Sequence, residues 1–274
     1  MLEWRGDEEL VVGDVRFTLA PAQAPRVDPS GAPDCFVLRK PRWMVECYEQ
    51  LQADAPARNI VELGIDRGGS TALLALLLEP HKLVSVDVRK TRVDALDAFI
   101  ASHKLQDRVR PYFDVDQADR ARLESIVDAE IGHAALDLVI DDASHLFPET
   151  CVSFNLLFPR LRPGGLYVIE DWSWQHMRDD RLESELSTPE AHERLARHLA
   201  AGVPEDKTPP LSFLILELAL TAGYAENIVA EILNLRRGWA VVRRGSAELD
   251  RDSFDIAAAY GGLGRSVLSG HSSR

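Results

Sequence analysis

Short apolar runs alternate with helical patterns through the middle of the chain, from Asn59 to Ile169. Buried parallel strands appear in sequences as nearly continuous apolar runs, and each needs a helical crossover to reach the next. The pattern therefore predicts an α/β fold with a mostly parallel sheet and helices on both of its faces. In such sheets ligands bind at the carboxyl ends of the strands. The runs that we interpret as strands end at Glu62 or occupy Leu83–Val86, Val109–Phe113, Leu136–Ile140 and Leu166–Ile169.

The segments that flank this alternating region have different patterns. Residues 1–38 are rich in Pro, Ala and Gly without sustained periodicity, which predicts an irregular or hairpin-like leader. Pro41 to Ala53 has helical spacing with a proline in the first turn, and residues 227–244 contain two apolar runs around LRRGW. Residues 176–212 are charged and end in GVPEDKTPP, which predicts a lid-like insertion. We expect one main domain, 39–274, after the leader.

The stretch Val61–Thr71, VELGIDRGGST, joins the first of these strands to a glycine-rich turn and a helix. Gly64, Gly68 and Gly69 lack a β-carbon, so a ligand can lie against the backbone, and Ser70 and Thr71 can cap the helix and donate hydrogen bonds. The stretch therefore predicts a cradle for a nucleoside-bearing cofactor. A purely structural β–α turn is the alternative.

The spacing of the turn separates three classes of cofactor site. Asp66 stands where a dinucleotide fingerprint needs its second glycine, and Ser70 stands where a phosphate loop needs its lysine. The remaining pattern, E-x-G-x-x-x-G, resembles the first motif of class I methyltransferases that use S-adenosylmethionine (SAM). SAM carries a sulfonium and an ammonium group and no phosphate, so Glu62 beside the turn is tolerable or helpful.

Acidic and amide residues at the next two strand ends add to this prediction. Asp87 lies about twenty residues beyond the turn, where a carboxylate can accept hydrogen bonds from both hydroxyls of a ribose, in SAM or in NAD. Asp114, Asp116 and Gln117 follow another strand and are available to an adenine or its ribose. The polarity of a solvated loop is the alternative for each of them.

Carboxylates gather after two later strands, in the sequences DDASH and EDW. We expect Asp141, Asp142, Glu170 and Asp171 to share a small volume with His145. Crowded carboxylates repel one another unless a cation neutralises them, and oxygen ligands favour Mg²⁺. Successive residues on a strand face opposite ways, so Glu170 and Asp171 can share a metal only if the chain bends there. The same alternation lets Asp141 face SAM while Asp142 faces the metal.

The combination of VELGIDRGGST, IDDASH and FPRLRPGGLYVIEDW resembles the metal-dependent sugar O-methyltransferases of macrolide and other antibiotic biosynthesis. The resemblance covers roughly Asn59 to Trp172. It implies that Asp142, Glu170 and Asp171 bind Mg²⁺, that His145 is the general base, and that the two runs within 227–244 form the antiparallel pair that closes the sheet. The leader and the residues after Arg178 match only loosely, so the acceptor is not determined.

Composition and charge narrow the setting. The chain has 274 residues and a net charge of −13, which argues against nucleic acid as a partner. No apolar tract reaches the length of about 18 residues that would span a membrane. Cys35, Cys47 and Cys151 lack metal or redox spacing, which favours a reducing cytoplasm. We expect a cytoplasmic homo-oligomer with a small-molecule acceptor.

The predicted function is Mg²⁺-assisted methylation of a hydroxyl of a deoxysugar, carried by a nucleotide diphosphate or by a glycosylated natural product. His145 would accept the proton, and Asp141 or His176 are the other candidates. Trp172 and Trp174 could stack on the acceptor or pack in the core, and Arg39, Lys40 and Arg42 could bind a diphosphate or form a solvated face. A catechol-type O-methyltransferase and a non-catalytic SAM-binding protein are the alternatives.

Overall fold

The structure is a computed structural model that describes residues 2–20, 32–54, 57–174, 209–236 and 238–259. These residues cluster into two compact units. The first unit comprises residues 1–116 and 125–137, and the second comprises residues 117–124 and 138–274. The predicted lid near residues 176–212 lies almost wholly outside the described residues, as does His176.

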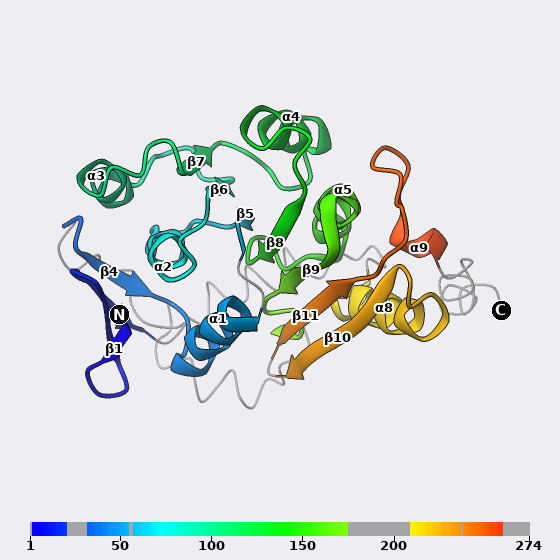
Figure 1. Cartoon of the computed structure of the whole chain (residues 1–274), viewed down its shortest axis with the longest axis horizontal. Helices are drawn as coiled ribbons and strands as arrows, with labels where there is room; N and C mark the ends of the chain where they lie inside the picture. Colours follow the sequence, from blue (N-terminus) through cyan, green and yellow to red (C-terminus); the bar gives the residue numbers. More distant parts are fainter. Residues whose placement is uncertain (1, 21–31, 55–56, 175–208, 237, 260–274) are drawn as a thin grey trace, which may run out of the picture. The chain divides into compact units, whose positions relative to one another are not determined.

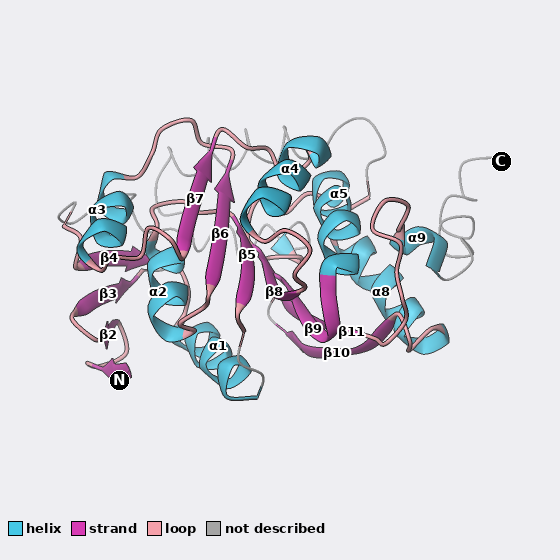
Figure 2. Cartoon of the chain, turned by 45° about the horizontal axis from the view of Figure 1, so that its top comes forward, coloured by secondary structure: helices cyan, strands magenta, loops and turns pink. Residues whose placement is uncertain are grey.

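The first unit contains three parallel strands, joined by helical crossovers as the alternating pattern predicts. Strand β5 (Asn59–Leu63) pairs with β6 (Lys82–Asp87), and β6 pairs with β7 (Val109–Phe113). Figure 2 shows these strands side by side. Helices α2 (Gly69–Leu77) and α3 (Asp94–Ser102) make the crossovers, and α1 (Arg42–Asp54) precedes β5. The register places Asp87 opposite Phe113 at the carboxyl ends of β6 and β7.

The leader forms a second sheet in the same unit, so of the two predicted possibilities, irregular or hairpin-like, its described residues have the hairpin-like one. Strands β1 (Leu2–Trp4), β2 (Glu9–Val12), β3 (Val15–Leu19) and β4 (Cys35–Leu38) lie in that order. Strands β2 and β3 form a hairpin around Gly13. In β3 Val15, Phe17 and Leu19 are buried and alternate with exposed residues, a period that marks a half-buried strand.

The leader sheet packs closely on the helices of the first unit. The ring of Phe36 in β4 meets the edge of Phe99 in α3 at 5.7 Å between centroids. A β-carbon built on Gly69 would lie 2.4 Å from the backbone oxygen of Val37. Glycine at position 69 is therefore needed for the approach of β4 to the start of α2.

We expect Gly69→Ala to lower the free energy of unfolding by about 1–3 kcal/mol, because the added methyl group collides with backbone that cannot swing aside. Urea denaturation followed by circular dichroism measures the change. Gly223→Ala is the matched control, since Gly223 is helical and its β-carbon would have no atom within 4 Å. That substitution should be neutral or stabilising by up to about 1 kcal/mol. Equal stability of the two variants would contradict the close packing.

The second unit contains β8 (Leu136–Asp141), α5 (Phe147–Leu157), a 3-10 turn η1 (Phe158–Arg160) and β9 (Leu161–Ile169). After the undescribed segment come α8 (Ser212–Tyr224), β10 (Val229–Arg236), β11 (Trp239–Arg244) and α9 (Ile256–Ala259). Strand β11 pairs antiparallel with both β9 and β10. In Figure 1, β10 and β11 are the two orange strands beside each other. The predicted antiparallel pair is confirmed.

The strand order is β5-β6-β7 in the first unit and β10-β11-β9-β8 in the second. The parallel strands β5–β6–β7, their helical crossovers and the antiparallel pair β10–β11 confirm the predicted α/β fold. Helix α4 (Arg120–Glu130) connects β7 to β8. Among the described helices, none has both the length and the apolarity that crossing a membrane requires.

Candidate functional site

The glycine turn follows β5 in the first unit and has the backbone geometry that the sequence predicts. Gly64 and Gly68 have φ values of 97° and 82°, in the left-handed region that glycine tolerates. The Gly64 N–H donates to the carbonyl of Val86 at 2.8 Å, which ties the turn to the end of β6. Asp66 also has a positive φ of 45°.

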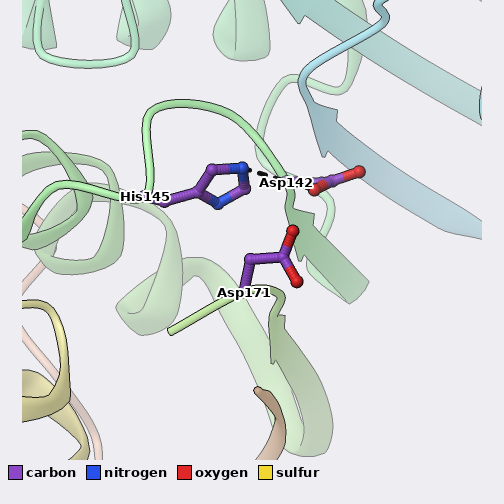
Figure 3. Close-up of side chains that lie close together, drawn as sticks. All are labelled: Asp142, His145 and Asp171. Atoms are coloured by element: carbon purple, nitrogen blue, oxygen red, sulfur yellow. Dashed lines mark ion pairs between the residues drawn. The ribbon is translucent and has the colours of Figure 1, made fainter. Parts of the chain in front are cut away.

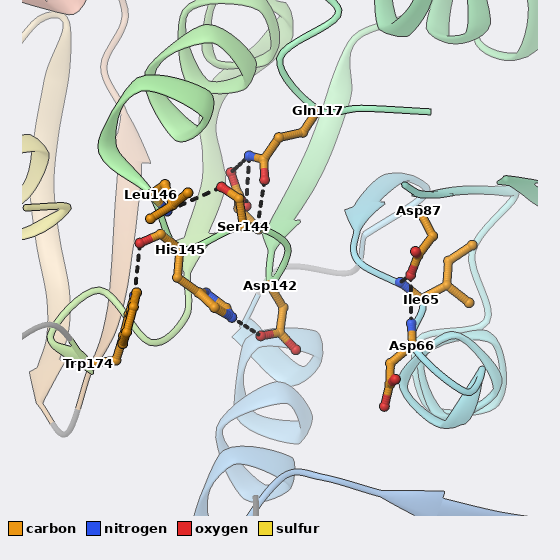
Figure 4. A network of polar contacts seen from close by, with 10 residues as sticks. Ile65, Asp66, Asp87, Gln117, Asp142, Ser144, His145, Leu146 and Trp174 are labelled. Atoms are coloured by element: carbon orange, nitrogen blue, oxygen red, sulfur yellow. Dashed lines mark hydrogen bonds and ion pairs between the residues drawn. The ribbon is translucent and has the colours of Figure 1, made fainter. Parts of the chain in front are cut away.

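Asp87 lies beside this turn and holds it through backbone hydrogen bonds. Its Oδ2 accepts the N–H groups of Ile65 and Asp66, both at 2.9 Å, as Figure 4 shows. Its Oδ1 accepts the N–H of Arg89 at 2.7 Å. A carboxylate has about four lone-pair sites, and three are occupied here, so roughly one remains for a ribose hydroxyl. The predicted bond to both ribose hydroxyls stays a prediction.

Glu62 is buried, with 1% of its side chain exposed, and joins elements of the first unit. Its Oε2 accepts the hydroxyls of Thr71 in α2 and Ser85 in β6 at 2.6 and 2.7 Å. Burial raises the pKa of Glu62, and hydrogen bonds from Ser70, Thr71 and Ser85 oppose that shift. These contacts give Glu62 a structural role, and its predicted contact with a cofactor stays a prediction.

The helix start departs from the prediction that Ser70 caps it. The N-cap of α2 is Gly68, no side chain caps it, and Ser70 bonds to Glu62 instead. A β-carbon on Gly68 would lie 2.8 Å from that of Leu96 in α3. Close packing therefore explains Gly68 and Gly69 without a ligand, whereas Gly64 is explained by its backbone angle.

The basic residues near α1 are engaged within the protein. Arg42 donates to Glu46 at 2.8 Å, and its guanidinium lies 4.5 Å from the centre of the Trp4 ring. Lys40 is buried, with its Nζ 6.0 Å from the centre of the Tyr48 ring. Lys40 is therefore not part of a solvated face, whereas the side chain of Arg42 stays 41% exposed.

Asp141 and Asp142 point in different directions at the end of β8. Asp141 is 2% exposed, and its carboxylate accepts hydrogen bonds from Tyr167 and Ser153, both at 3.0 Å. Burial raises the pKa of Asp141 to about 6, against these hydrogen bonds. Asp142 is only partly buried. The alternation is as predicted, but Asp141 faces the protein interior, and its predicted roles with SAM and in proton transfer stay predictions.

Gln117 is also turned inward, whereas Asp114 and Asp116 are exposed. The Gln117 Nε2 donates to the carboxylate of Asp141 at 3.2 Å and to the hydroxyl of Ser153 at 2.9 Å. Its Oε1 accepts the N–H of Ser144 at 2.8 Å. Both ends of the amide are thus occupied by the protein, which leaves it poorly suited to bind an adenine.

Asp142, His145 and Asp171 form the acidic cluster of the second unit. One ligand atom from each lies within 4.8 Å of the others, and His145 Nε2 is 3.8 Å from Asp142 Oδ1 (Figure 3). Asp142 follows β8, and Asp171 comes two residues after the end of β9. His145 and Asp171 have left-handed φ values of 57° and 52°, which a non-glycine residue adopts only when its surroundings hold it there.

The chain bends after Glu170, as the sharing of a metal requires, but Glu170 is not part of this cluster. Its N–H donates to the carbonyl of Asp141 at 2.9 Å, and its side chain is 2% exposed. Asp171 is exposed. The structure therefore brings together Asp142, Asp171 and His145 of the predicted metal and catalytic residues, and the metal-binding role of Glu170 stays a prediction.

The donor set of the acidic cluster fits a divalent cation. Mg²⁺ is commonly held by one or two carboxylates and keeps several water ligands. Asp142 and Asp171 can supply the two carboxylates. An imidazole is a weaker partner for Mg²⁺ than for Zn²⁺ or Fe²⁺. His145 is thus placed either to bind the cation or to accept a proton beside it.

Residues 142–146 are anchored by contacts that the sequence pattern did not reveal. The Trp174 Nε1–H donates to the carbonyl of His145 at 2.9 Å, and the Leu146 N–H donates to Ser144 Oγ at 3.2 Å (Figure 4). Trp174 therefore contacts backbone, where stacking or core packing was predicted. No local motif identifies these anchors, nor the buried partners Ser153 and Tyr167.

Residues 61–172 match a family model described as a methyltransferase domain. The matched segment begins in β5 and contains the glycine turn, Asp87 and the acidic cluster.

Several curated relatives share shorter segments with the chain. The 8-demethyl-8-alpha-L-rhamnosyl tetracenomycin-C 2'-O-methyltransferase of Streptomyces olivaceus is 54% identical over 56 residues, 20% of this chain and 14% of the relative. The mycinamicin VI 2''-O-methyltransferase of Micromonospora griseorubida is 41% identical over 80 residues, 29% of this chain and 19% of the relative. The chain thus matches less than a fifth of the length of each of these relatives.

Solved structures of methyltransferases align over most of the chain. MycE methyltransferase from the mycinamycin biosynthetic pathway, in complex with Mg and SAH, aligns with a TM-score of 0.49 and 23% identity over 74% of this chain and 50% of that one. An O-methyltransferase family protein from Burkholderia thailandensis aligns with a TM-score of 0.48 and 20% identity over 76% of this chain and 57% of that one.

Proposed function

We propose that the chain is a SAM-dependent O-methyltransferase that methylates a sugar hydroxyl with the help of Mg²⁺. The match of residues 61–172 to the methyltransferase domain model supports this proposal. The observation that carries this proposal is the acidic cluster of Asp142, His145 and Asp171. A protein that only binds SAM has no need of two carboxylates and an imidazole within reach of one cation. Transfer to an alcohol needs a proton acceptor, and an electrophilic cation assists it by lowering the pKa of the hydroxyl.

The relatives support a glycosylated small molecule as the acceptor. Their names describe O-methylation of 8-demethyl-8-alpha-L-rhamnosyl tetracenomycin-C and of mycinamicin VI. A deoxysugar attached to a natural product is therefore our first choice of acceptor, and the corresponding nucleotide-diphosphate sugar is the second. A catechol-type diol is a third class that the same residues could serve.

The residues divide the work of the reaction. Asp142 and Asp171 would hold the cation, which would lower the pKa of an acceptor hydroxyl and orient it. His145 Nε2, 3.8 Å from Asp142 Oδ1, would accept the hydroxyl proton. The glycine turn and Asp87 would bind SAM, which supplies an already activated methyl group, so alignment and proton removal are the tasks left to the protein.

A transfer assay tests the proposal. The protein is incubated with SAM, Mg²⁺ and one acceptor at a time: a rhamnosylated aglycone, the same aglycone without sugar, a nucleotide-diphosphate rhamnose, and catechol. Mass spectrometry should detect one added methyl group on the glycoside sugar and none on the bare aglycone. Methylation of catechol alone would favour the catechol-type enzyme, and binding of SAM without transfer to any acceptor would favour the non-catalytic protein.

We expect Asp87→Ala to weaken binding of S-adenosylhomocysteine about 10-fold or more, because it removes a charged acceptor and releases the glycine turn. Isothermal titration calorimetry measures the dissociation constant. Asp66→Asn is the matched control: it removes the ion pair with Arg89 on the same turn, while asparagine tolerates the left-handed backbone. The control should bind within about twofold of the wild type. Tight binding of NADH in place of S-adenosylhomocysteine would refute the cofactor assignment.

The cytoplasmic location, the homo-oligomeric state and the division at residue 39 stay predictions from the sequence.

A further inference from the structure

The backbone at His145 must be held in place by its neighbours. Its φ of 57° lies in the left-handed region, which costs an L-residue roughly 1–2 kcal/mol. His145 and Asp142 flank a short turn and supply two of the cluster's ligand atoms. Whatever stabilises this turn therefore also sets the distance between the imidazole and the carboxylate.

Gln117 contacts the turn from the interior of the second unit. Its Oε1 accepts the N–H of Ser144, the residue directly before His145, at 2.8 Å. Gln117 is 5% exposed and Ser144 is partly buried, so this hydrogen bond is partly shielded from water and is stronger than a fully exposed one. The Ser144 hydroxyl in turn accepts the N–H of Leu146. Hydrogen bonds thus hold the residue before His145 and the residue after it.

The orientation of the Gln117 amide is determined by Asp141. The Nε2 group donates to Oδ2 of Asp141 at 3.2 Å and to the Ser153 hydroxyl at 2.9 Å. A flipped amide would place its oxygen against the carboxylate and its NH₂ group against the N–H of Ser144, and both contacts would be repulsive. Asp141 thus fixes which end of Gln117 faces the turn.

We propose that Gln117 is a positioning residue, which transmits the fixed geometry of the buried Asp141 to the turn that carries Asp142 and His145. This inference rests on the proposed cation site and adds a residue that touches neither cation nor substrate. It also assigns Asp141 and Gln117 a shared function inside the protein. Residues that orient metal ligands in this way typically change metal affinity by about 10–100-fold when they are replaced.

The test measures Mn²⁺ binding to the full chain by electron paramagnetic resonance, with Mn²⁺ as the probe for the cation site. Gln117→Leu should weaken binding about 10–100-fold, because the turn loses its interior acceptor. Tyr167→Phe is the matched control, since it removes a hydrogen bond of 3.0 Å to Asp141 without touching the turn. It should change Mn²⁺ affinity by less than about threefold, although both variants lose a hydrogen bond that contributes a similar free energy to stability.

A charge-exchange pair guards against a variant that fails to fold. Gln117→Glu keeps an acceptor for the Ser144 N–H but places a carboxylate against Asp141, so it should weaken Mn²⁺ binding. Adding Asp141→Asn restores a donor between the two side chains, and the double variant should recover wild-type affinity to within about threefold. Recovery is specific to positioning. If Asp141 acted on the cation only through its charge, removing that charge from the Gln117→Glu variant would lower Mn²⁺ affinity further.

The outcomes separate this inference from the proposed function. If the wild type does not bind Mn²⁺, the cation site itself is refuted. If the wild type binds and Gln117→Leu binds equally well, or if the double variant does not recover, the cation site stands and the positioning role of Gln117 is overturned. A loss in Tyr167→Phe as large as that in Gln117→Leu would also overturn it.

Discussion

Asp142→Asn and Asp171→Asn each lower methyl transfer by about 10²–10³-fold, because each removes an anionic ligand of a cation that contributes several kcal/mol to the transition state. Asparagine is the informative substitution at position 171, where φ is 52°, because it tolerates the left-handed backbone better than alanine. The loss then reports on the carboxylate and not on backbone strain. Initial rates at saturating SAM and a range of Mg²⁺ concentrations measure it.

Chelation and a surface control complete this experiment. Treatment with EDTA should abolish transfer by the wild type, and added Mg²⁺ should restore it. Asp252→Asn removes an exposed carboxylate of the same unit that lies outside the acidic cluster, and it should leave the rate within about twofold. Full activity in a metal-free sample would refute the acidic cluster as a cation site. Glu170→Gln, run in parallel, tests whether the buried Glu170 contributes.

His145→Asn lowers turnover by about 10²–10⁴-fold, because the variant has no group at this position that accepts a proton at neutral pH. Asparagine again suits the left-handed backbone at position 145. Transfer rates are measured alongside the dissociation constants of Mn²⁺ and S-adenosylhomocysteine. A general base predicts that turnover falls while both dissociation constants stay within about threefold, since the loss is confined to the transition state.

The same variant distinguishes the two roles that the His145 imidazole can have, general base and cation ligand. If His145 binds the cation, Mn²⁺ affinity falls together with turnover, and excess Mg²⁺ restores part of the rate. His103→Asn is a useful control, because His103 pairs with Asp14 at 3.1 Å in the first unit and has no place in the acidic cluster. Normal turnover in His145→Asn would refute both roles.

Much of the fold and part of the site could be predicted because they depend on local patterns. The structure contains the five predicted strands, each ending within one residue of the end of its apolar run, at Glu62, Val86, Phe113, Ile140 and Ile169. Polar residues just beyond a strand end lie at the sheet edge wherever the rest of the chain goes. For the leader, the sequence left an irregular and a hairpin-like form open because its strands are short, and only the alternation in β3 distinguishes them from a loop.

The site predictions stayed open where the sequence could not show which of two adjacent acidic residues is buried and which is accessible. Asp141 and Asp142 are equivalent in the sequence, as are Glu170 and Asp171, yet one of each pair is buried and the other is not. The direction of each side chain depends on the strand pleat and on the residue at which the strand ends. For Glu170 and Asp171, the positive φ at Asp171 turns the chain and so separates the directions of the two side chains. Residue propensities do not predict at which residue such a positive φ occurs.

The sequence by itself determined the alternation of strands and helices, the glycine turn, and the acidic and histidine residues after β8 and β9, because each follows from spacing along a short stretch of chain. Only the tertiary structure decided which of these residues are exposed and what holds them. Asp141 is buried because Gln117, Ser153 and Tyr167, which lie 24, 12 and 26 residues away, bring donors to it. Burial of a charged group is tolerable only with such partners, and partners that distant are brought together by packing alone.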